Sequence, residues 1–205
     1  RPRMFTGIIE EVGTVRSVAE GELAISAKTV LWGTNLGDSI SVNGVDLTAK
    51  FFDEEGFSAN VMPETYRRSN LGDLRPGDRV NLERSMQLAS RVSGHLVRGV
   101  VEATGTLHSF TDDGDATIVR IEAPADILRH TLVKGPICID GISLTVTAKD
   151  AQTFSVSVVQ YTKEHTNLFT RKPGDRINLE SDIIGRYVEQ LLEERGEGGH
   201  SRGAA

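Results

Sequence analysis

Cysteine is nearly absent from this chain of 205 residues, and its scarcity excludes two kinds of stabilisation. Cys138 is the single cysteine, so it has no partner for an intrachain disulfide, and a multi-cysteine metal site is excluded as well. Four of the five histidines are not spaced as ligands are in metal-binding motifs. These are His108, His130, His165 and His200. We therefore expect a protein without a bound metal.

Long hydrophobic runs and a surplus of basic residues are also missing. No apolar run approaches the ~18 residues that a membrane-spanning helix needs, so we expect no membrane partner. Lys and Arg number 23 against 29 Asp and Glu, and the net charge of -6 argues against a nucleic-acid partner, which requires a basic face. Met4 is the expected initiator and no secretory signal is visible, so the expected location is the cytoplasm.

The chain is instead rich in glycine and contains an internal repeat. Its 21 glycines suit turn-rich β structure, because glycine adopts the positive φ angles that tight turns need. The segment Ser41–Thr48 reappears 97 positions later as Cys138–Thr145, and Pro76–Glu83 reappears at the same offset as Pro173–Glu180. A solenoid needs three or more repeats, so this pattern predicts a tandem duplication of one small closed domain.

Each half of the repeat predicts short β-strands. Apolar and polar residues alternate over Val12–Val18, Ser39–Val42 and Phe57–Val61, and turn residues separate these stretches. Short strands at this spacing favour a small barrel, because closure removes the unpaired edges of a sheet. Thr65–Leu71 and the equivalent Thr162–Leu168 are expected to form a short helix or turn that caps each barrel. The predicted fold class is all-β, with two tandem barrels.

One segment outside both repeats has a helical pattern. Asp182–Arg195 is rich in helix formers and carries an apolar stripe at helical spacing, with Asp182 suited to the N-cap or first turn. The stripe consists of Ile183, Ile184, Tyr187, Val188, Leu191 and Leu192. Gly196 is expected to end the helix, and residues 196–205 are expected to be a disordered tail. The stripe packs either on the chain's own barrels or on the same helix of other subunits, and we favour the second.

Several segments taken together resemble the riboflavin synthase family. The resemblance runs from Met4 to about Leu192 and is specific as a combination, although no single motif is. The segments are Met4–Ile9, Val42–Gly44, Pro63–Thr65, Ser69–Gly72, Ser93–His95, Lys134–Gly135, Ile139–Thr145 and Asn178–Asp182. The resemblance implies a homotrimer whose subunits have two six-stranded Greek-key barrels, residues 4–97 and 98–181, and a C-terminal trimerisation helix, residues 182–195.

The resemblance also implies a transferase reaction that needs no cofactor. Two molecules of 6,7-dimethyl-8-ribityllumazine exchange a four-carbon unit and give riboflavin and 5-amino-6-ribitylaminouracil. One substrate binds in each barrel, and the active site forms where the N-terminal barrel of one subunit faces the C-terminal barrel of a neighbour. Holding two identical rings face to face turns a chance encounter into an oriented complex.

Polar residues at matched positions of the two halves are the candidates for these sites. Thr48 and Thr145 match, and although threonine is common in strands, a matched polar pair beside a glycine turn favours ligand contact. The expected catalytic residues are Asp46, His95, Ser143 and Asp182. The expected substrate-binding residues are Thr6, Gly7, Ile8, Ser39, Gly44, Thr48, Glu64, Thr65, Lys134, Asp140, Gly141, Thr145 and Thr162.

The chain departs from the family pattern at two positions close to the expected chemistry. Asp46 stands where the family has cysteine, and Val100 stands where it has a second histidine. His95 is expected to act as a general acid or base, and Asp46 is either solvated and inert or desolvated and basic. Two alternatives therefore stay open: an enzyme of secondary metabolism that joins two other unsaturated substrates by a cycloaddition, and a non-catalytic lumazine- or flavin-binding protein.

Overall fold

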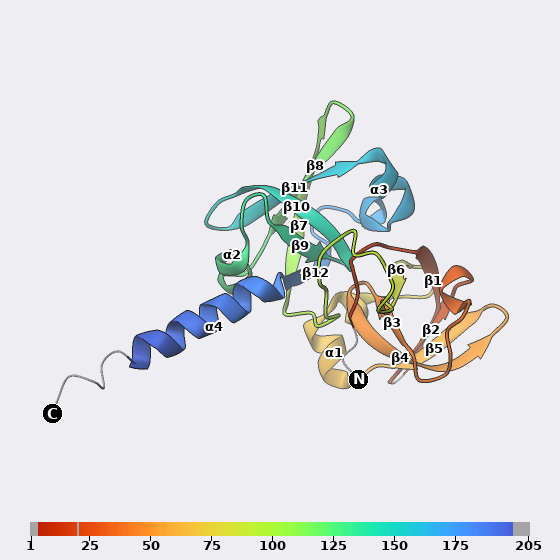
Figure 1. Cartoon of the computed structure of the whole chain (residues 1–205). Helices are drawn as coiled ribbons and strands as arrows, with labels where there is room; N and C mark the ends of the chain where they lie inside the picture. The colour runs from red at the N-terminus through yellow and green to blue at the C-terminus, as the bar shows by residue number, and fades with distance from the viewer. Residues whose placement is uncertain (1–3, 20, 199–205) are drawn as a thin grey trace.

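The computed structural model describes residues 4–19 and 21–198, which form two closed six-stranded antiparallel barrels (Figure 1). The first barrel closes in the order β1-β2-β5-β4-β3-β6. Its strands are β1 (Glu11–Ala19), β2 (Glu22–Ser26), β3 (Ser39–Val42), β4 (Val45–Asp53), β5 (Gly56–Asn60) and β6 (Arg79–Arg84). The three strands predicted from alternation are β1, β3 and β5, so the period-two pattern located them correctly.

The second barrel closes in the order β10-β11-β8-β7-β12-β9. Its strands are β7 (Ala103–Asp113), β8 (Ala116–Glu122), β9 (Pro136–Ile139), β10 (Ile142–Lys149), β11 (Thr153–Val159) and β12 (Arg176–Ser181). When each strand is matched to its copy in the other half, both barrels have the same circular order. The structure therefore confirms the all-β fold and the tandem duplication.

Matched irregularities help both barrels to close. The pairing of β1 with β2 shifts register between Val15 and Ser17, and the pairing of β7 with β8 shifts at the equivalent place. A bulge bends its strand and increases the local twist, as a small closed barrel requires. Each barrel then has its own apolar core, in which Phe57 and Phe154 are fully buried at equivalent positions.

Short helices follow the equivalent strands β5 and β11, close to where the sequence predicted caps. They are α1 (Pro63–Arg68) and α3 (Gln160–His165), followed by the 3-10 turns η2 (Asn70–Asp73) and η3 (Leu168–Thr170). Pro63 suits the first turn of α1, because that turn leaves its N–H groups without helical partners. Two further short elements, η1 (Thr29–Leu31) and α2 (Ala125–His130), were not predicted.

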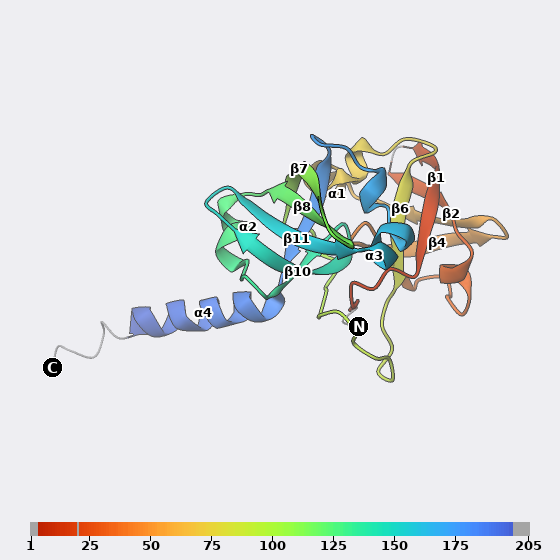
Figure 2. The same cartoon turned by 90° about the horizontal axis from the view of Figure 1, so that it is seen from above.

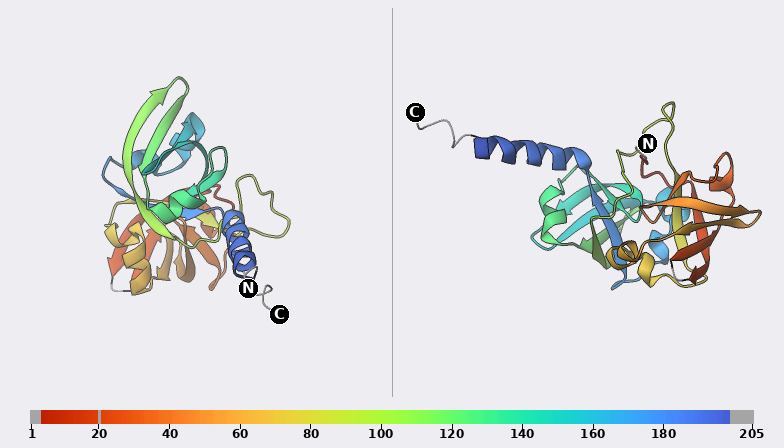
Figure 3. Two further views of the ribbon diagram at one scale, coloured as in Figure 1. Left: turned by 90° about the vertical axis from the view of Figure 1, so that its left-hand side faces the viewer. Right: turned by 90° about the horizontal axis from the view of Figure 1, so that it is seen from below.

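The C-terminal helix α4 (Ile183–Gly198) projects away from both barrels in Figure 1, Figure 2 and the right panel of Figure 3. It continues past the predicted end at Gly196, since one glycine in a final turn weakens a helix without breaking it. The rest of the expected tail, residues 199–205, lies outside the described part of the chain. No helix in the described ranges is both long and apolar enough to cross a membrane.

The two barrels meet at a pair of equivalent turns. Asn43 and Asp140 have φ angles of 47° and 46°, and the next residues, Gly44 and Gly141, have φ angles of 79° and 82°. The nearly equal angles show that the two turns have the same conformation, and the reciprocal close contacts of their glycines show that a pseudo-twofold axis relates them. A Cβ atom on either glycine would lie 2.8 Å from the backbone nitrogen of the other, so both positions require glycine.

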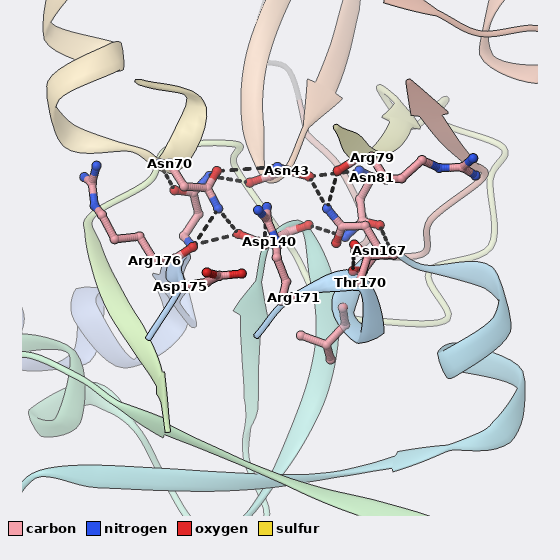
Figure 4. Close-up of polar contacts among 12 residues, drawn as sticks. Asn43, Asn70, Arg79, Asn81, Asp140, Asn167, Thr170, Arg171, Asp175 and Arg176 are labelled. Carbon is pink, nitrogen blue, oxygen red and sulfur yellow. Dashed lines mark hydrogen bonds and ion pairs between the residues drawn. The ribbon is translucent and has the colours of Figure 1, made fainter. Parts of the chain in front are cut away.

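Four buried asparagines surround these turns and join the barrels (Figure 4). They are Asn70, Asn81, Asn167 and Asn178. Oδ1 of Asn43 accepts hydrogen bonds from the backbone N–H of Asn81 at 2.9 Å and from the side chain of Asn167 at 3.0 Å. Oδ1 of Asp140 accepts the equivalent bonds from Asn178 and Asn70, both at 2.8 Å. In each set the side-chain bond crosses from one barrel to the other, so amide groups fix the relative orientation of the barrels.

Candidate functional site

A cavity of about 500 Å³ lies against strand β4 of the first barrel. It brings together three of the predicted site residues, Asp46, Thr48 and Thr65. The remaining lining residues are Leu47, Lys50, Asn60 and Met62, and sequence reasoning singled out none of them. Threonine hydroxyls, an amide, an ammonium and a carboxylate around an apolar wall match the polar ring edge and the polyol chain of a lumazine.

Asp46 is the half-buried acid of this cavity. Its backbone N–H donates to the carbonyl of Gly99 at 2.9 Å, which brings the neighbouring Val100 to the same region. Oδ1 of Asp46 is buried, and no group in residues 4–19 or 21–198 forms a hydrogen bond with it. The two positions at which the chain departs from the family pattern are therefore close together in space.

The same set of positions exists in the second barrel. Ser143, Thr145 and Thr162 lie 97 positions after Asp46, Thr48 and Thr65, on β10 and α3. Thr145 is exposed, and Thr162 is half-buried at the start of α3. The exposed Lys134 lies nearby, because its backbone N–H donates to the carbonyl of Val146 at 2.8 Å. Ser143, Thr145 and Thr162 are expected to share one side of the second barrel, as their equivalents do in the first.

His95 and Ser143 contact each other directly. Nδ1 of His95 lies 2.6 Å from the Ser143 hydroxyl, and among the described residues Nε2 of His95 has no hydrogen-bond partner. Burial lowers the pKa of His95, while the charge of Asp182 acts in the opposite direction. The imidazole is therefore neutral at pH 7 and is able to accept a proton.

The N-terminal segment reaches the second barrel beside this pair. The carbonyl of Gly7 accepts a hydrogen bond from the backbone N–H of Ser143 at 2.8 Å, and the carbonyl of Thr6 accepts one from the backbone N–H of His95 at 3.1 Å. The side chain of the next residue, Ile8, is exposed. The predicted residues Thr6 and Gly7 therefore support the site with their backbone atoms.

A second cavity, of about 650 Å³, adjoins the N-terminal segment. It is lined in part by Thr6, Ile8 and Ser39, together with Trp32 and Glu83. Ser39 lies opposite Thr48 in the pairing of β3 with β4, and it lines this cavity, whereas Thr48 lines the first. The hydroxyl of Ser39 is buried, and the described chain offers it no hydrogen-bond partner.

Other predicted site residues have structural contacts. Glu64 is exposed on α1, where hydrogen bonds from Arg68 and Arg67 lower its pKa. Asp182 caps α4, because its Oδ1 accepts from the backbone N–H of Ile184 at 3.0 Å. Asp140, Gly44 and Gly141 form the interface between the barrels, where Asp140 is fully buried. Their contacts with a substrate stay predictions.

Two buried glutamates near the site were missed by sequence reasoning. Glu83 lies near the end of β6, and Glu180 occupies the equivalent place in β12; both side chains are almost completely buried. Each follows a run of buried residues, Val80–Leu82 in one copy and Ile177–Leu179 in the other. An acid repeated at the same buried position of both copies was the signal available in the sequence.

Comparison with known proteins connects this geometry to a family. The lumazine binding domain matches twice, over residues 6–85 and 98–182. Riboflavin synthase of Actinobacillus pleuropneumoniae is 45% identical over 193 residues, which cover 92% of this chain and 90% of the relative. Riboflavin synthase of Mycobacterium tuberculosis H37Rv is 46% identical over 201 residues, which cover 94% of this chain and 100% of the relative. That of Bacillus subtilis strain 168 is 35% identical over 198 residues, 95% of this chain and 92% of the relative.

Solved structures show the same fold at lower identity. LumP complexed with 6,7-dimethyl-8-(1'-D-ribityl) lumazine has a TM-score of 0.78 at 21% identity and covers 86% of this chain and 98% of that chain. LumP complexed with riboflavin has a TM-score of 0.80 at the same identity and coverage. With the family domain matched in both barrels and relatives aligned along nearly their whole length, this chain belongs to the riboflavin synthase family.

Proposed function

We propose that this chain catalyses the riboflavin synthase reaction, in which two molecules of 6,7-dimethyl-8-ribityllumazine give riboflavin and 5-amino-6-ribitylaminouracil. The observation that carries the proposal is the duplication of the ligand positions. Thr48 and Thr65 line a cavity of the first barrel, and Thr145 and Thr162 hold the same positions in the second. Two copies of one site suit a reaction between two copies of one molecule, because they present the rings in related orientations.

His95 and Ser143 are the pair that handles the proton in this proposal. The neutral imidazole of His95 takes a proton from the C7 methyl group of the bound lumazine, and the electron pair of the broken C–H bond stays on the ring system as a carbanion. The Ser143 hydroxyl, 2.6 Å from Nδ1, orients the imidazole. The charge of Asp182 favours the protonated imidazole and so assists the transfer.

Asp46 faces the ring in the first barrel. Its buried Oδ1 has no hydrogen-bond partner among the described residues, which suits a proton acceptor for a water molecule or a substrate group in the cavity. Carboxylate is a poorer soft nucleophile than thiolate, so in this chain the step at the first barrel is general-base catalysis.

The proposal includes a homotrimer in the cytoplasm. Five residues of the α4 stripe are 51% to 62% exposed: Val188, Ile184, Leu191, Tyr187 and Leu192. A groove of about 690 Å³ runs beside them, with Leu132 and Pro136 on its other wall. An amphipathic helix needs a packed apolar face for stability, and the same helix of neighbouring subunits supplies that face.

The two other hypotheses from the sequence are not favoured. A redirected cycloaddition enzyme or a non-catalytic lumazine carrier would explain Asp46 and Val100, but the relatives at 45% and 46% identity are riboflavin synthases. LumP shares the fold at 21% identity, which carries no argument about activity.

Turnover of 6,7-dimethyl-8-ribityllumazine tests the proposal. We expect riboflavin fluorescence to rise with one riboflavin formed for every two lumazines consumed. Ser143→Ala should slow the reaction by about 10²-fold or more, because it releases His95 from its partner. The matched control is Ser17→Ala, at an exposed position of β1 far from both sets of ligand residues, which should leave the rate unchanged. Binding of lumazine without any riboflavin would instead support a carrier.

A further inference from the structure

Two segments cross between the barrels in equivalent ways. Phe5 of the N-terminal segment pairs antiparallel with Val97 of the linker between the barrels. The residues after each of them turn toward the opposite barrel, where Gly7 and Gly99 have φ angles of 75° and 76°. The carbonyl of Gly7 accepts from the N–H of Ser143 at 2.8 Å, and the carbonyl of Gly99 accepts from the N–H of Asp46 at 2.9 Å. Each crossing segment therefore touches one candidate catalytic position.

Glu83 holds the first of these segments. Its Oε1 accepts hydrogen bonds from the backbone N–H and the hydroxyl of Thr6, both at 2.7 Å, and its Oε2 accepts from the backbone N–H of Gly7 at 3.0 Å. The glutamate is 4% exposed, so these bonds form away from solvent. A buried carboxylate with three donors fixes the position of those donors, because losing any one bond leaves a buried charge poorly satisfied.

Glu180 holds the second segment with a similar set of hydrogen bonds, to which the Arg98 side chain adds an ion pair at 3.4 Å. Its oxygens accept from the backbone N–H groups of Arg98, Gly99 and Val100 at 2.7, 3.1 and 3.0 Å, and the side chain is 2% exposed. Glu83 belongs to the first barrel and its segment touches Ser143 of the second. Glu180 belongs to the second barrel and its segment touches Asp46 of the first. Each glutamate therefore belongs to one barrel and holds a segment that contacts the candidate catalytic residue of the other barrel.

We propose that Glu83 is a positioning residue for the site of the second barrel: its carboxylate fixes the Thr6–Gly7 turn, and the carbonyls of that turn orient His95 and Ser143. Glu180 has the corresponding role for Asp46 in the first barrel. The consequence for turnover rests on the proposed function, whereas the control of backbone position does not. Glu83 bonds to the expected substrate-binding residues Thr6 and Gly7, and Glu180 bonds to the linker between the barrels, so both glutamates act through the segments they hold.

The hydrogen bonds that Glu83 accepts from Thr6 and Gly7 depend on pH, because burial and nearby charges shift the pKa of its carboxyl group. Burial raises the pKa of Glu83 to about 7, against the effect of the hydrogen bonds from Thr6 and Gly7, and the charge of Glu10 raises it further. Arg84 pairs with Glu10 at 2.6 Å. On the side of β9, the buried Cys138 thiol faces both Glu83 and Glu180, and its own pKa is raised well above the usual value. The carboxylate form, which accepts all three bonds, therefore prevails above about pH 7.

Amide NMR of the full-length chain tests directly whether each glutamate positions the segment that contacts the site of the other barrel. The signals to follow are the backbone amides of Ser143 and Asp46, because these two groups donate to the carbonyls of the crossing segments. Glu83→Gln should shift the Ser143 amide and leave the Asp46 amide in place. Glu180→Gln is the matched control and should do the reverse. Equal shifts of both amides in both variants, or no shift in either, would overturn the proposal.

Kinetics with 6,7-dimethyl-8-ribityllumazine add the functional readout. Glu83→Gln should lower kcat by about 10-fold or more while KM changes little, because misplacement of a reacting group acts on the chemical step. If Glu83→Gln does not fold, Thr6→Val removes one of the three bonds, and Thr6→Ser should restore both the amide position and kcat. An unchanged kcat together with a shifted Ser143 amide would overturn the catalytic part. If the wild-type chain forms no riboflavin but the two glutamine variants shift the amides of Ser143 and Asp46 as expected, the proposed function is overturned and the positioning role is supported.

Discussion

Gly44 and Gly141 face each other across the pseudo-twofold axis, and each occupies the space that a side chain on the other would need. Gly44→Ala should therefore lower the free energy of unfolding by about 3 kcal/mol, from the strain of a positive φ angle and from contact with the opposite backbone. Gly77→Ala is the matched control, since Gly77 has a φ angle of 97° but open space around it. That control should lose only about 1 to 2 kcal/mol in chemical denaturation. Equal losses would mean that the close approach of the barrels contributes nothing.

Asp140 and Arg171 form an ion pair that the first barrel lacks, in which the carboxylate is fully buried and the Arg171 side chain is 15% exposed. Nη2 of Arg171 donates to Oδ2 of Asp140 at 3.0 Å, whereas the equivalent residues are Asn43 and Leu74. Arg171→Leu alone should lower the free energy of unfolding by about 3 to 5 kcal/mol, because it leaves a buried carboxylate without its counter-charge. Adding Asp140→Asn should recover most of this loss, since it restores the arrangement at Asn43.

A second contact explains why asparagine at position 140 should restore the stability that Arg171→Leu loses. Oδ1 of Asn167 is buried, and within the described ranges no group donates to it. The equivalent atom, Oδ1 of Asn70, accepts from the side-chain amide of Asn43, and a carboxylate at position 140 has no N–H for the same purpose. Denaturant unfolding of the two single variants and the double variant measures the coupling. A double variant no more stable than Arg171→Leu would contradict this account.

Glu83 should make stability depend on pH. Its pKa rises from 4.5 in the unfolded chain to about 7 in the folded chain, so the folded chain holds a proton that the unfolded chain releases between these values. The free energy of unfolding should therefore fall as the pH rises from about 4.5 to about 7, and this contribution should level off above that. Glu83→Gln lacks the group, so its stability should fall less over the same window. If the free energy of unfolding varied with pH in the same way in the wild-type chain and in Glu83→Gln, Glu83 would not be the titrating group.

Asp46 and Val100 should limit the rate of riboflavin formation. The backbone contact between Asp46 and Gly99 places these two positions side by side, and neither residue supplies the thiol or imidazole of the family pattern. The double change Asp46→Cys with Val100→His should raise kcat by about 10-fold, since a positioned acid or base is worth ~10²–10⁴-fold. Steady-state riboflavin fluorescence measures kcat. Val100→Ala is the control for loss of the valine side chain without gain of an imidazole. A folded double variant that binds lumazine and gains nothing would show that the pocket no longer needs these groups.

Removal of α4 should change the oligomeric state. Truncation after Ser181 deletes the exposed apolar stripe and the ion pairs of Arg129 with Glu189 and Glu193. Light scattering should show the mass falling from that of a trimer. Val188→Glu tests the stripe alone, and Gln190→Glu is its control at an exposed polar position of the same helix. A truncated chain of unchanged oligomeric state would remove α4 from the interface.

The sequence by itself determined the architecture of each half. The repeat at an offset of 97 positions identified two copies of one domain, and alternation over 12–18, 39–42 and 57–61 located three strands that the structure confirms. Both signals are local or depend on comparing the chain with itself, so they need no knowledge of how the barrels dock. The same is true of α4, whose apolar stripe follows from a period of 3.6 residues.

Only the tertiary structure decided which polar residues face a cavity and which face the other barrel. Asp140 lies in the turn before β10 and Thr145 lies within β10; both are polar, yet Asp140 is fully buried between the barrels while Thr145 is exposed. Glu83 was unnoticed because its partners, Thr6 and Gly7, are 77 and 76 positions away in the chain. A hydrogen bond between distant residues leaves no periodic trace in a sequence, because only the folded first barrel, in which β1 pairs with β6, brings its donor and acceptor together.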